Sequence, residues 1–191
     1  SINPQSMQER TLKTIGRHHS VAAISDLFHQ FRRYNTISIN MDIIAGLPGE
    51  TEKDMIDTME KIAALGPDNL TVHTLALKRG SELKLAAGAY PLPDEKTTSS
   101  MTAIAAKYAN QMGMVPYYLY RQKYMTGNLE NIGYARPGTE CVYNIQIMEE
   151  RQTRVAAAVK ETSHPRVLYT MGYPIFSLNG GRFENQLVDV A

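Results

Sequence analysis

Cysteine is almost absent from this chain: Cys141 is the only one among its 191 residues. A single thiol cannot form an internal disulfide, and it cannot hold an iron–sulfur cluster, which takes about three or four thiolates. A catalytic thiol would need a base nearby, and no sequence neighbour of Cys141 suggests one. We therefore interpret Cys141 as a small buried hydrophobic residue.

An excess of one charge and long apolar runs are also lacking. The chain has 20 basic and 19 acidic residues, and no block of about five or six basic residues indicates nucleic acid as a partner. No apolar run approaches the roughly 18 residues that span a bilayer, and no signal peptide is present. The chain begins at Ser1 within an apparent strand, so we expect a fragment of a longer cytoplasmic protein.

Strands and helices alternate through the first 77 residues. The strands predicted at 1–5, 36–44 and 69–77 are separated by segments with apolar residues at helical spacing, most clearly 51–65. Strands joined by helices of this length pair in parallel through right-handed crossovers. We therefore expect an α/β fold with adjacent parallel strands and helices on one side. The three strands should end near Gln5, Ile44 and Leu75.

Helix caps and later elements are predicted from local signals. Ser6 and Glu9 form the pattern of a capping box, and Ser20 is expected to cap the next helix. A helix should open at Asp94 or Thr97. Beyond it we predict an aromatic strand, a polar loop, a strand or short helix, and hairpin-like pieces, which lie at 116–124, 126–138, 142–148, and 167–170 with 174–178.

The stretch NMDIIAGLPGET, residues 40–51, carries the clearest functional signal. It reads as a strand, a glycine and proline turn, and the start of a helix. In an α/β barrel the carboxyl end of each strand faces the ligand. Asp42 lies near that end, in an apolar run where an unpaired carboxylate would be costly. We interpret Asp42 as a ligand-binding group, the alternative being a cap on the turn near Gly46.

Other polar residues have two interpretations each. Gln5 and Arg17 suit a site at a strand end, or a turn residue and a helix C-terminal cation. His73 is interpreted as a core histidine. An aromatic segment follows, with tyrosines, cations and amides that suit a flat acidic ligand or an amphipathic edge strand: Tyr117, Tyr118, Tyr120, Arg121, Lys123, Tyr124, Asn128, Asn131 and Tyr134.

Four segments together resemble the coproporphyrinogen-type radical S-adenosylmethionine (SAM) family. SINPQSM with IGRHHS is similar to the fourth strand and following helix of that family, INMDIIAGLPGET to its fifth strand and turn, and PDNLTVHTLALKRGSEL to its sixth strand. The segment YYLYRQKYMTGNLENIGYARPGTECVYN resembles the Bacillus-type second form of oxygen-independent coproporphyrinogen III dehydrogenase (oxidase). The resemblance covers roughly residues 1–150.

The resemblance implies the C-terminal half of a partial (βα)6 barrel with a C-terminal α+β extension. It divides the chain into barrel residues 1–85, a family-specific extension at 86–150 and a tail of unclear organisation at 151–191. It further implies a SAM cofactor and a 4Fe–4S cluster, which together remove hydrogen from a propionate of a porphyrinogen so that carbon dioxide leaves. The family's SAM contacts match Gln5, Arg17, Asp42 and Ala76. Within the aromatic segment we predict Tyr118, Tyr120, Arg121 and Tyr134 as the residues that contact the substrate.

Some features depart from the family pattern. The cysteine loop and the first strands of the barrel have no counterpart here, so the chain alone should bind no cluster and should be inactive. Its first strand would leave an open barrel edge that invites self-association. An electron donor or acceptor is implied as a further partner. The alternatives are a haem chaperone on the same scaffold and an unrelated α/β barrel enzyme.

Overall fold

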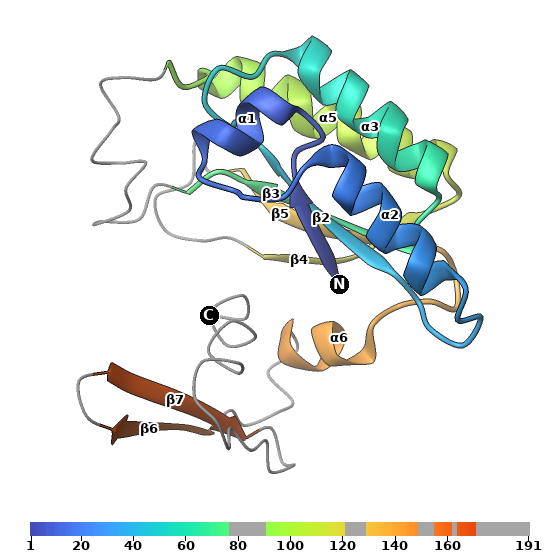
Figure 1. Ribbon diagram of the computed structural model, residues 1–191. Coiled ribbons are helices and arrows are strands. Elements are labelled where there is room, and N and C mark those ends of the chain that lie inside the picture. The colour runs from blue at the N-terminus through green and yellow to red at the C-terminus, as the bar shows by residue number, and fades with distance from the viewer. Residues whose placement is uncertain (77–90, 121–128, 149–154, 162–163, 171–191) are drawn as a thin grey trace. The chain divides into compact units, whose positions relative to one another are not determined.

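The computed structural model describes residues 1–76, 91–120, 129–148, 155–161 and 164–170, and the chain divides into two units, Ser1–Cys141 and Val142–Ala191. The first unit contains four helices and five strands among its described residues (Figure 1). In chain order they are β1 (Ile2–Gln5), α1 (Glu9–Thr14), α2 (Val21–Arg32), β2 (Asn40–Ala45), α3 (Glu52–Leu65), β3 (Asn69–Thr74), α5 (Glu95–Gln111), β4 (Val115–Tyr120) and β5 (Asn131–Ala135).

The five strands form one sheet in the order β1-β2-β3-β5-β4. Strands β1, β2 and β3 are parallel neighbours, which confirms the predicted parallel arrangement. Strand β5 pairs antiparallel with both β3 and β4. The prediction of a loop across 126–138 was wrong, because it gave too much weight to the asparagine and glycine of β5.

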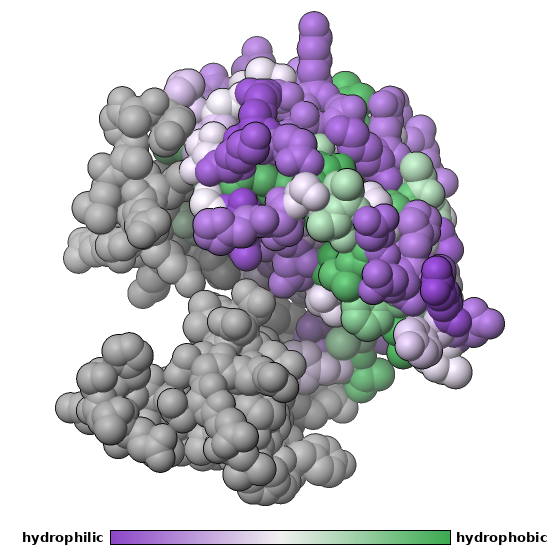
Figure 2. Space-filling model, in the orientation of Figure 1, coloured by the Kyte–Doolittle hydropathy of each residue, from purple (hydrophilic) through white to green (hydrophobic). Residues whose placement is uncertain are grey.

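Helices cover one face of this sheet (Figure 1). Along β2 the side chains of Met41, Ile43 and Ala45 are buried, whereas those between them are half-buried. This alternation is the period of a strand with one face in the core. The core joins the β2 and β3 side chains to the apolar sides of the helices, including Leu12, Phe28, Met55, Met59, Ile62, Leu70, Val72 and Met101. The outer surface over the helices is mostly hydrophilic (Figure 2).

The helix ends follow the sequence signals with one exception. Ser20 accepts a hydrogen bond from the Ala23 amide at 3.1 Å, as predicted. The capping box predicted at Ser6 and Glu9 is wrong. Helix α1 begins at Glu9, and the Glu9 carboxylate instead accepts from the Val21 amide at 2.7 Å, at the start of the next helix.

The second unit holds a helix and a hairpin among its described residues. Helix α6 spans Val142–Met148, and strands β6 (Val155–Glu161) and β7 (His164–Thr170) pair antiparallel. The predicted hairpin piece at 167–170 lies within β7, and β6 was not predicted. The piece predicted at 174–178 lies outside the described residues. Within the part of the chain that the structure describes, no helix has both the length and the apolarity needed to cross a membrane.

Candidate functional site

The sheet face opposite the helices carries a group of polar and aromatic side chains. Because neighbouring residues of a strand point to opposite faces, the residues between the core positions of β2 and β3 share this face. Strand β4 is separated from β3 by β5 in the sheet, and tyrosines of β4 lie on the same face. We call this group the polar face: Asn40, Asp42, Thr71, His73, Tyr118 and Tyr120.

Hydrogen bonds tie Asp42 into this face. The Asn40 amide nitrogen donates to Asp42 Oδ1 at 2.6 Å. The Ser1 hydroxyl lies 3.2 Å from Asp42 Oδ2 and 2.9 Å from Asn3 Oδ1, and its one hydrogen is shared between these two acceptors. Asn40 is held in turn by Thr71, whose hydroxyl donates to Asn40 Oδ1 at 3.2 Å. The Asp42 carboxylate is therefore oriented by side chains of its own face, and none of these partners belongs to the turn near Gly46.

Tyr118 lies against strand β5 at Gly133. The two residues are paired between β4 and β5, and a Cβ at position 133 would fall within the Tyr118 ring. Only glycine leaves this space, so the ring can lie across the backbone of β5 and place its hydroxyl 3.1 Å from Thr71 Oγ1. Burial raises the pKa of Tyr118 well above its ordinary value, so the hydroxyl keeps its proton at neutral pH.

Replacing Gly133 by alanine should lower the stability of the chain by about 1–3 kcal/mol, the usual cost of overpacking. The new methyl group would force the Tyr118 ring off β5. Denaturant unfolding of the single variants and of Gly133→Ala/Tyr118→Ala measures the effect. In the double variant the added methyl meets no ring, so the cost of Gly133→Ala should largely vanish there. An equal cost in both backgrounds would show that the ring does not occupy this space.

His73 and Tyr120 form a second pair on the polar face. The Tyr120 hydroxyl lies 3.3 Å from His73 Nδ1, and the Tyr120 ring stacks with that of Tyr118 at 12°. Burial lowers the pKa of His73, and the negative charge of Asp42 opposes this shift. The ordinary value is about 6.5, so the imidazole is neutral at pH 7. His73 is half-buried and lies on the polar face rather than in the core, contrary to our interpretation from the sequence.

The other residues predicted to contact SAM end or follow strands β1 and β3 or helix α1, whereas Asp42 is the third residue of β2. Gln5 ends β1, pairs with Ile43 of β2, and has φ of 65°, in the left-handed region that a glutamine seldom adopts. Strain of this kind is often found at ligand sites. Ala76 follows β3 and is half-buried, and Arg17 is exposed just after α1. The structure thus brings Gln5 beside the strand of Asp42.

The residues predicted to contact substrate are divided between the two faces. Tyr118 and Tyr120 lie on the polar face, as described above. Tyr134 is buried in the hydrophobic core on the helical side, so its ring cannot meet a ligand on the polar face, and it is not part of the site. Arg121 lies outside the described residues. The sequence analysis did not identify Asn40 or Thr71. Asn40 lies two residues from Asp42 on the same strand, which was a usable signal, whereas Thr71 is placed beside Asp42 only by the register between β2 and β3.

The turn after β2 contains a buried carboxylate, Glu50. Gly46 and Gly49 provide the positive φ angles of this turn, and the Ser6 hydroxyl donates to Glu50 Oε1. This contact joins the β1–α1 turn to the β2–α3 turn. Burial raises the pKa of Glu50, while the hydrogen bond from Ser6 opposes the shift.

Glu50→Gln should stabilise the chain at pH 7 by on the order of 1 kcal/mol, because it removes the cost of burying a charge. A raised pKa in the folded state means that folding favours the protonated carboxyl. Stability is therefore lost as the pH rises from the ordinary value of about 4.3 through the raised one. Unfolding curves from acid to neutral pH should show the variant's advantage growing over that window. An advantage that is constant with pH would contradict the assignment.

The residues of this chain fit SAM better than they fit a metal cluster. A half-buried carboxylate that accepts hydrogen bonds suits the hydroxyls of a ribose. The only cysteine of the sequence, Cys141, is half-buried. Within the described residues there is no group of three or more histidine, cysteine, aspartate and glutamate side chains that could hold a metal ion.

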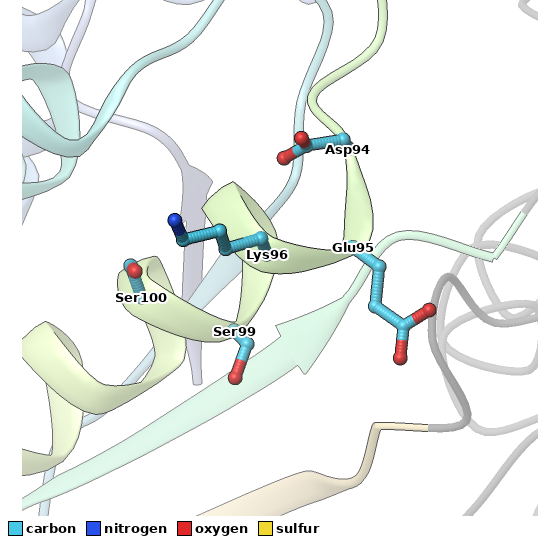
Figure 3. A pocket seen from close by; sticks show the side chains of 5 residues that line it. All are labelled: Asp94, Glu95, Lys96, Ser99 and Ser100. Atoms are coloured by element: carbon cyan, nitrogen blue, oxygen red, sulfur yellow. The ribbon is translucent and has the colours of Figure 1, made fainter.

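A separate open pocket lies at the start of α5 (Figure 3). It is lined by Asp94, Glu95, Lys96, Ser99 and Ser100. Asp94 caps the helix itself, accepting from the Thr97 amide at 2.8 Å. The side chains of Glu95 and Lys96 point away from each other. This pocket shows no convergent set of polar groups, and we assign no function to it.

Comparison with known proteins shows which proteins this chain is similar to. No family model matches the chain. It is 48% identical over 153 residues to the oxygen-independent coproporphyrinogen-III oxidase-like protein HemZ of Bacillus subtilis, a match that covers 80% of this chain and 30% of that protein. It is 23% identical over 147 residues to the heme chaperone HemW of Mycobacterium tuberculosis, covering 76% of this chain and 35% of the relative.

A solved structure shows the same fold in part. Coproporphyrinogen III oxidase from Escherichia coli, described as a radical SAM enzyme, matches with a TM-score of 0.57 and 20% identity, over 80% of this chain and 32% of that one. The chain thus spans about a third of the length of the proteins it matches. The resemblance drawn from its four segments is confirmed, and the chain is a homologue of one part of the oxygen-independent coproporphyrinogen-III oxidase-like proteins.

Proposed function

We propose that this chain is part of a radical SAM enzyme of haem biosynthesis that oxidatively decarboxylates coproporphyrinogen III to protoporphyrinogen IX. The polar face would receive both SAM and the porphyrinogen. The observation that carries the proposal is the placement of Asp42 on a sheet face that also presents the stacked rings of Tyr118 and Tyr120. One surface then offers a carboxylate for a nucleoside and aromatic rings for a tetrapyrrole.

Asp42 is suited to hold the ribose of SAM. Its oxygens can accept several hydrogen bonds, and Asn40 and Ser1 use only part of that capacity. The fixed position of Oδ1 against Asn40 reduces the side-chain entropy lost on binding. Gln5, which ends the neighbouring strand β1 opposite Ile43 and has an unusual backbone angle, would add an amide.

The cluster is expected to come from outside these residues. When bound, a 4Fe–4S cluster together with SAM would supply the radical chemistry that begins such reactions. The chain has one thiol where about three are needed. The role we propose for this chain is therefore to bind and orient the two organic molecules, while the thiolates are provided by the rest of the protein.

The aromatic side of the polar face would hold the porphyrinogen. Pyrrole rings can pack against the rings of Tyr118 and Tyr120, which are already stacked on each other. His73 is neutral at pH 7 and hydrogen-bonded to Tyr120, so it would add no charge against an apolar ring. Arg121 directly follows β4 in the sequence and would pair with a propionate carboxylate.

A second candidate function is haem binding without decarboxylation. It is favoured by the 23% identity to a heme chaperone. Haem transfer and porphyrinogen turnover, both measured with the complete protein, separate the two functions. Turnover with no haem transfer supports the enzyme, and haem transfer with no turnover supports the chaperone.

A further inference from the structure

The hydrogen bonds of the polar face form a row in which the donor and the acceptor of each bond can be assigned. An ionised carboxylate only accepts, so the Asn40 group facing Asp42 must be its NH2. The second hydrogen of that NH2 is directed to Ser1 Oγ at 2.9 Å. Asn40 Oδ1 then faces Thr71, which must donate to it.

The direction of the row extends to Tyr118. A hydroxyl has one hydrogen, and the Thr71 hydroxyl already donates its hydrogen to Asn40 Oδ1. At the 3.1 Å contact between Thr71 and Tyr118 the tyrosine must therefore be the donor. The position of the ring is fixed by Gly133, where nothing larger than hydrogen fits beneath it. The hydroxyl hydrogen of Tyr118 is therefore directed toward the Thr71 hydroxyl.

From this direction we infer that Tyr118 meets a ligand as a hydrogen-bond acceptor, and that it is a specificity-determining residue for ligands that carry N–H donors. The inference rests on the proposed function of the polar face. A ligand that needed a hydrogen from Tyr118 would have to reverse the row. Thr71 would then donate to Tyr118, and the carbonyl oxygen of Asn40 would lose its donor beside a carboxylate, which is costly in a partly buried site.

The consequence concerns which tetrapyrroles the face prefers. A porphyrinogen carries pyrrole N–H groups, and its saturated bridges allow these groups to tilt out of the ring plane toward an acceptor. A metal chelate of a porphyrin has no N–H, because the metal has replaced the hydrogens. Tyr118 should therefore favour the porphyrinogen over the chelate. This preference is independent of the size of the ring and of its carboxylate arms.

The test compares two ligands across hydroxyl-deletion variants of the chain. Coproporphyrinogen III, kept reduced under anaerobic conditions, is titrated beside palladium(II) coproporphyrin III. That metal takes no axial ligand, so His73 cannot bind it. Tyr118→Phe should weaken binding of the porphyrinogen by about three- to tenfold, the value of one hydrogen bond. It should leave binding of the palladium chelate unchanged.

Two further variants show whether the row of hydrogen bonds sets the preference. Thr71→Val removes the acceptor that holds the Tyr118 hydrogen and should reduce the preference for porphyrinogen, while Thr71→Ser keeps a hydroxyl and should restore it. Tyr108→Phe, on helix α5, removes a tyrosine hydroxyl that bonds Glu60 and should change neither affinity. Melting temperatures are measured for every variant.

The outcomes separate this inference from the proposed function. Equal losses for both ligands in Tyr118→Phe, or no loss for either, would overturn the acceptor role while porphyrinogen binding by the unaltered chain still supported the function. If the unaltered chain bound neither ligand, the proposed function and the inference would both fail. A selective loss for the porphyrinogen, with Thr71→Ser behaving as the unaltered chain, is the expected result.

Discussion

Asp42→Asn in the complete protein should weaken SAM binding by about ten- to a hundredfold and affect porphyrinogen binding much less. Hydrogen bonds to a charged group are worth roughly 1.5–3 kcal/mol, and each 1.4 kcal/mol is about a tenfold change in affinity. The carboxylate accepts from hydroxyls with both oxygens, whereas the amide keeps one acceptor and turns a donor toward the site. Titration of SAM under anaerobic conditions gives the affinity directly.

The control for this change is a carboxylate away from the site. Asp26 is exposed on helix α2, so Asp26→Asn should leave SAM affinity unchanged. Melting temperatures test the structural alternative. If Asp42→Asn lowered the melting temperature and left SAM affinity as it was, Asp42 would be a structural residue and the assignment of the polar face to SAM would fail.

The second large effect concerns the cluster. After reconstitution with iron and sulfide and removal of the excess, this 191-residue chain should retain no 4Fe–4S cluster and should not cleave SAM. One thiolate cannot replace the three or four that such clusters use. Iron and sulfide analysis with the visible absorption spectrum gives the answer.

Cys141→Ser serves as the matched control for reconstitution. If the chain binds no cluster, this variant should give the same near-zero iron and sulfide content. A stoichiometric cluster in the unaltered chain that was lost in Cys141→Ser would contradict the account, because it would show that Cys141 is a ligand in an assembly with other chains.

Much of the parallel sheet could be predicted because its signals are local. The β-branched runs and the helical spacing between them fix three strands and the intervening helices, and tertiary packing agrees with both. Strand β5 could not be found in this way. Gly133 and Asn131 disfavour a strand taken alone, yet Gly133 makes room for Tyr118, and the Asn131 side chain accepts from the Thr74 amide at 2.7 Å.

The site was predicted only in part, for a similar reason. Asp42 was visible as a charge inside an apolar run, but its partners Asn40 and Thr71 are ordinary residues of a strand. Which of them share its face depends on the register between β2 and β3, where Asp42 pairs with Thr71. Tyr134 was misplaced for the same reason, because a register that puts Gly133 opposite Tyr118 turns the next residue toward the core.

The most direct test of the central claim is to assay the complete protein anaerobically with coproporphyrinogen III, SAM and a reductant. Carbon dioxide, 5′-deoxyadenosine and the vinyl product are measured together. The account predicts that all three form, and that Asp42→Asn reduces them in parallel with its loss of SAM affinity. Haem binding and transfer by the same protein, with no carbon dioxide and no vinyl product, would contradict it.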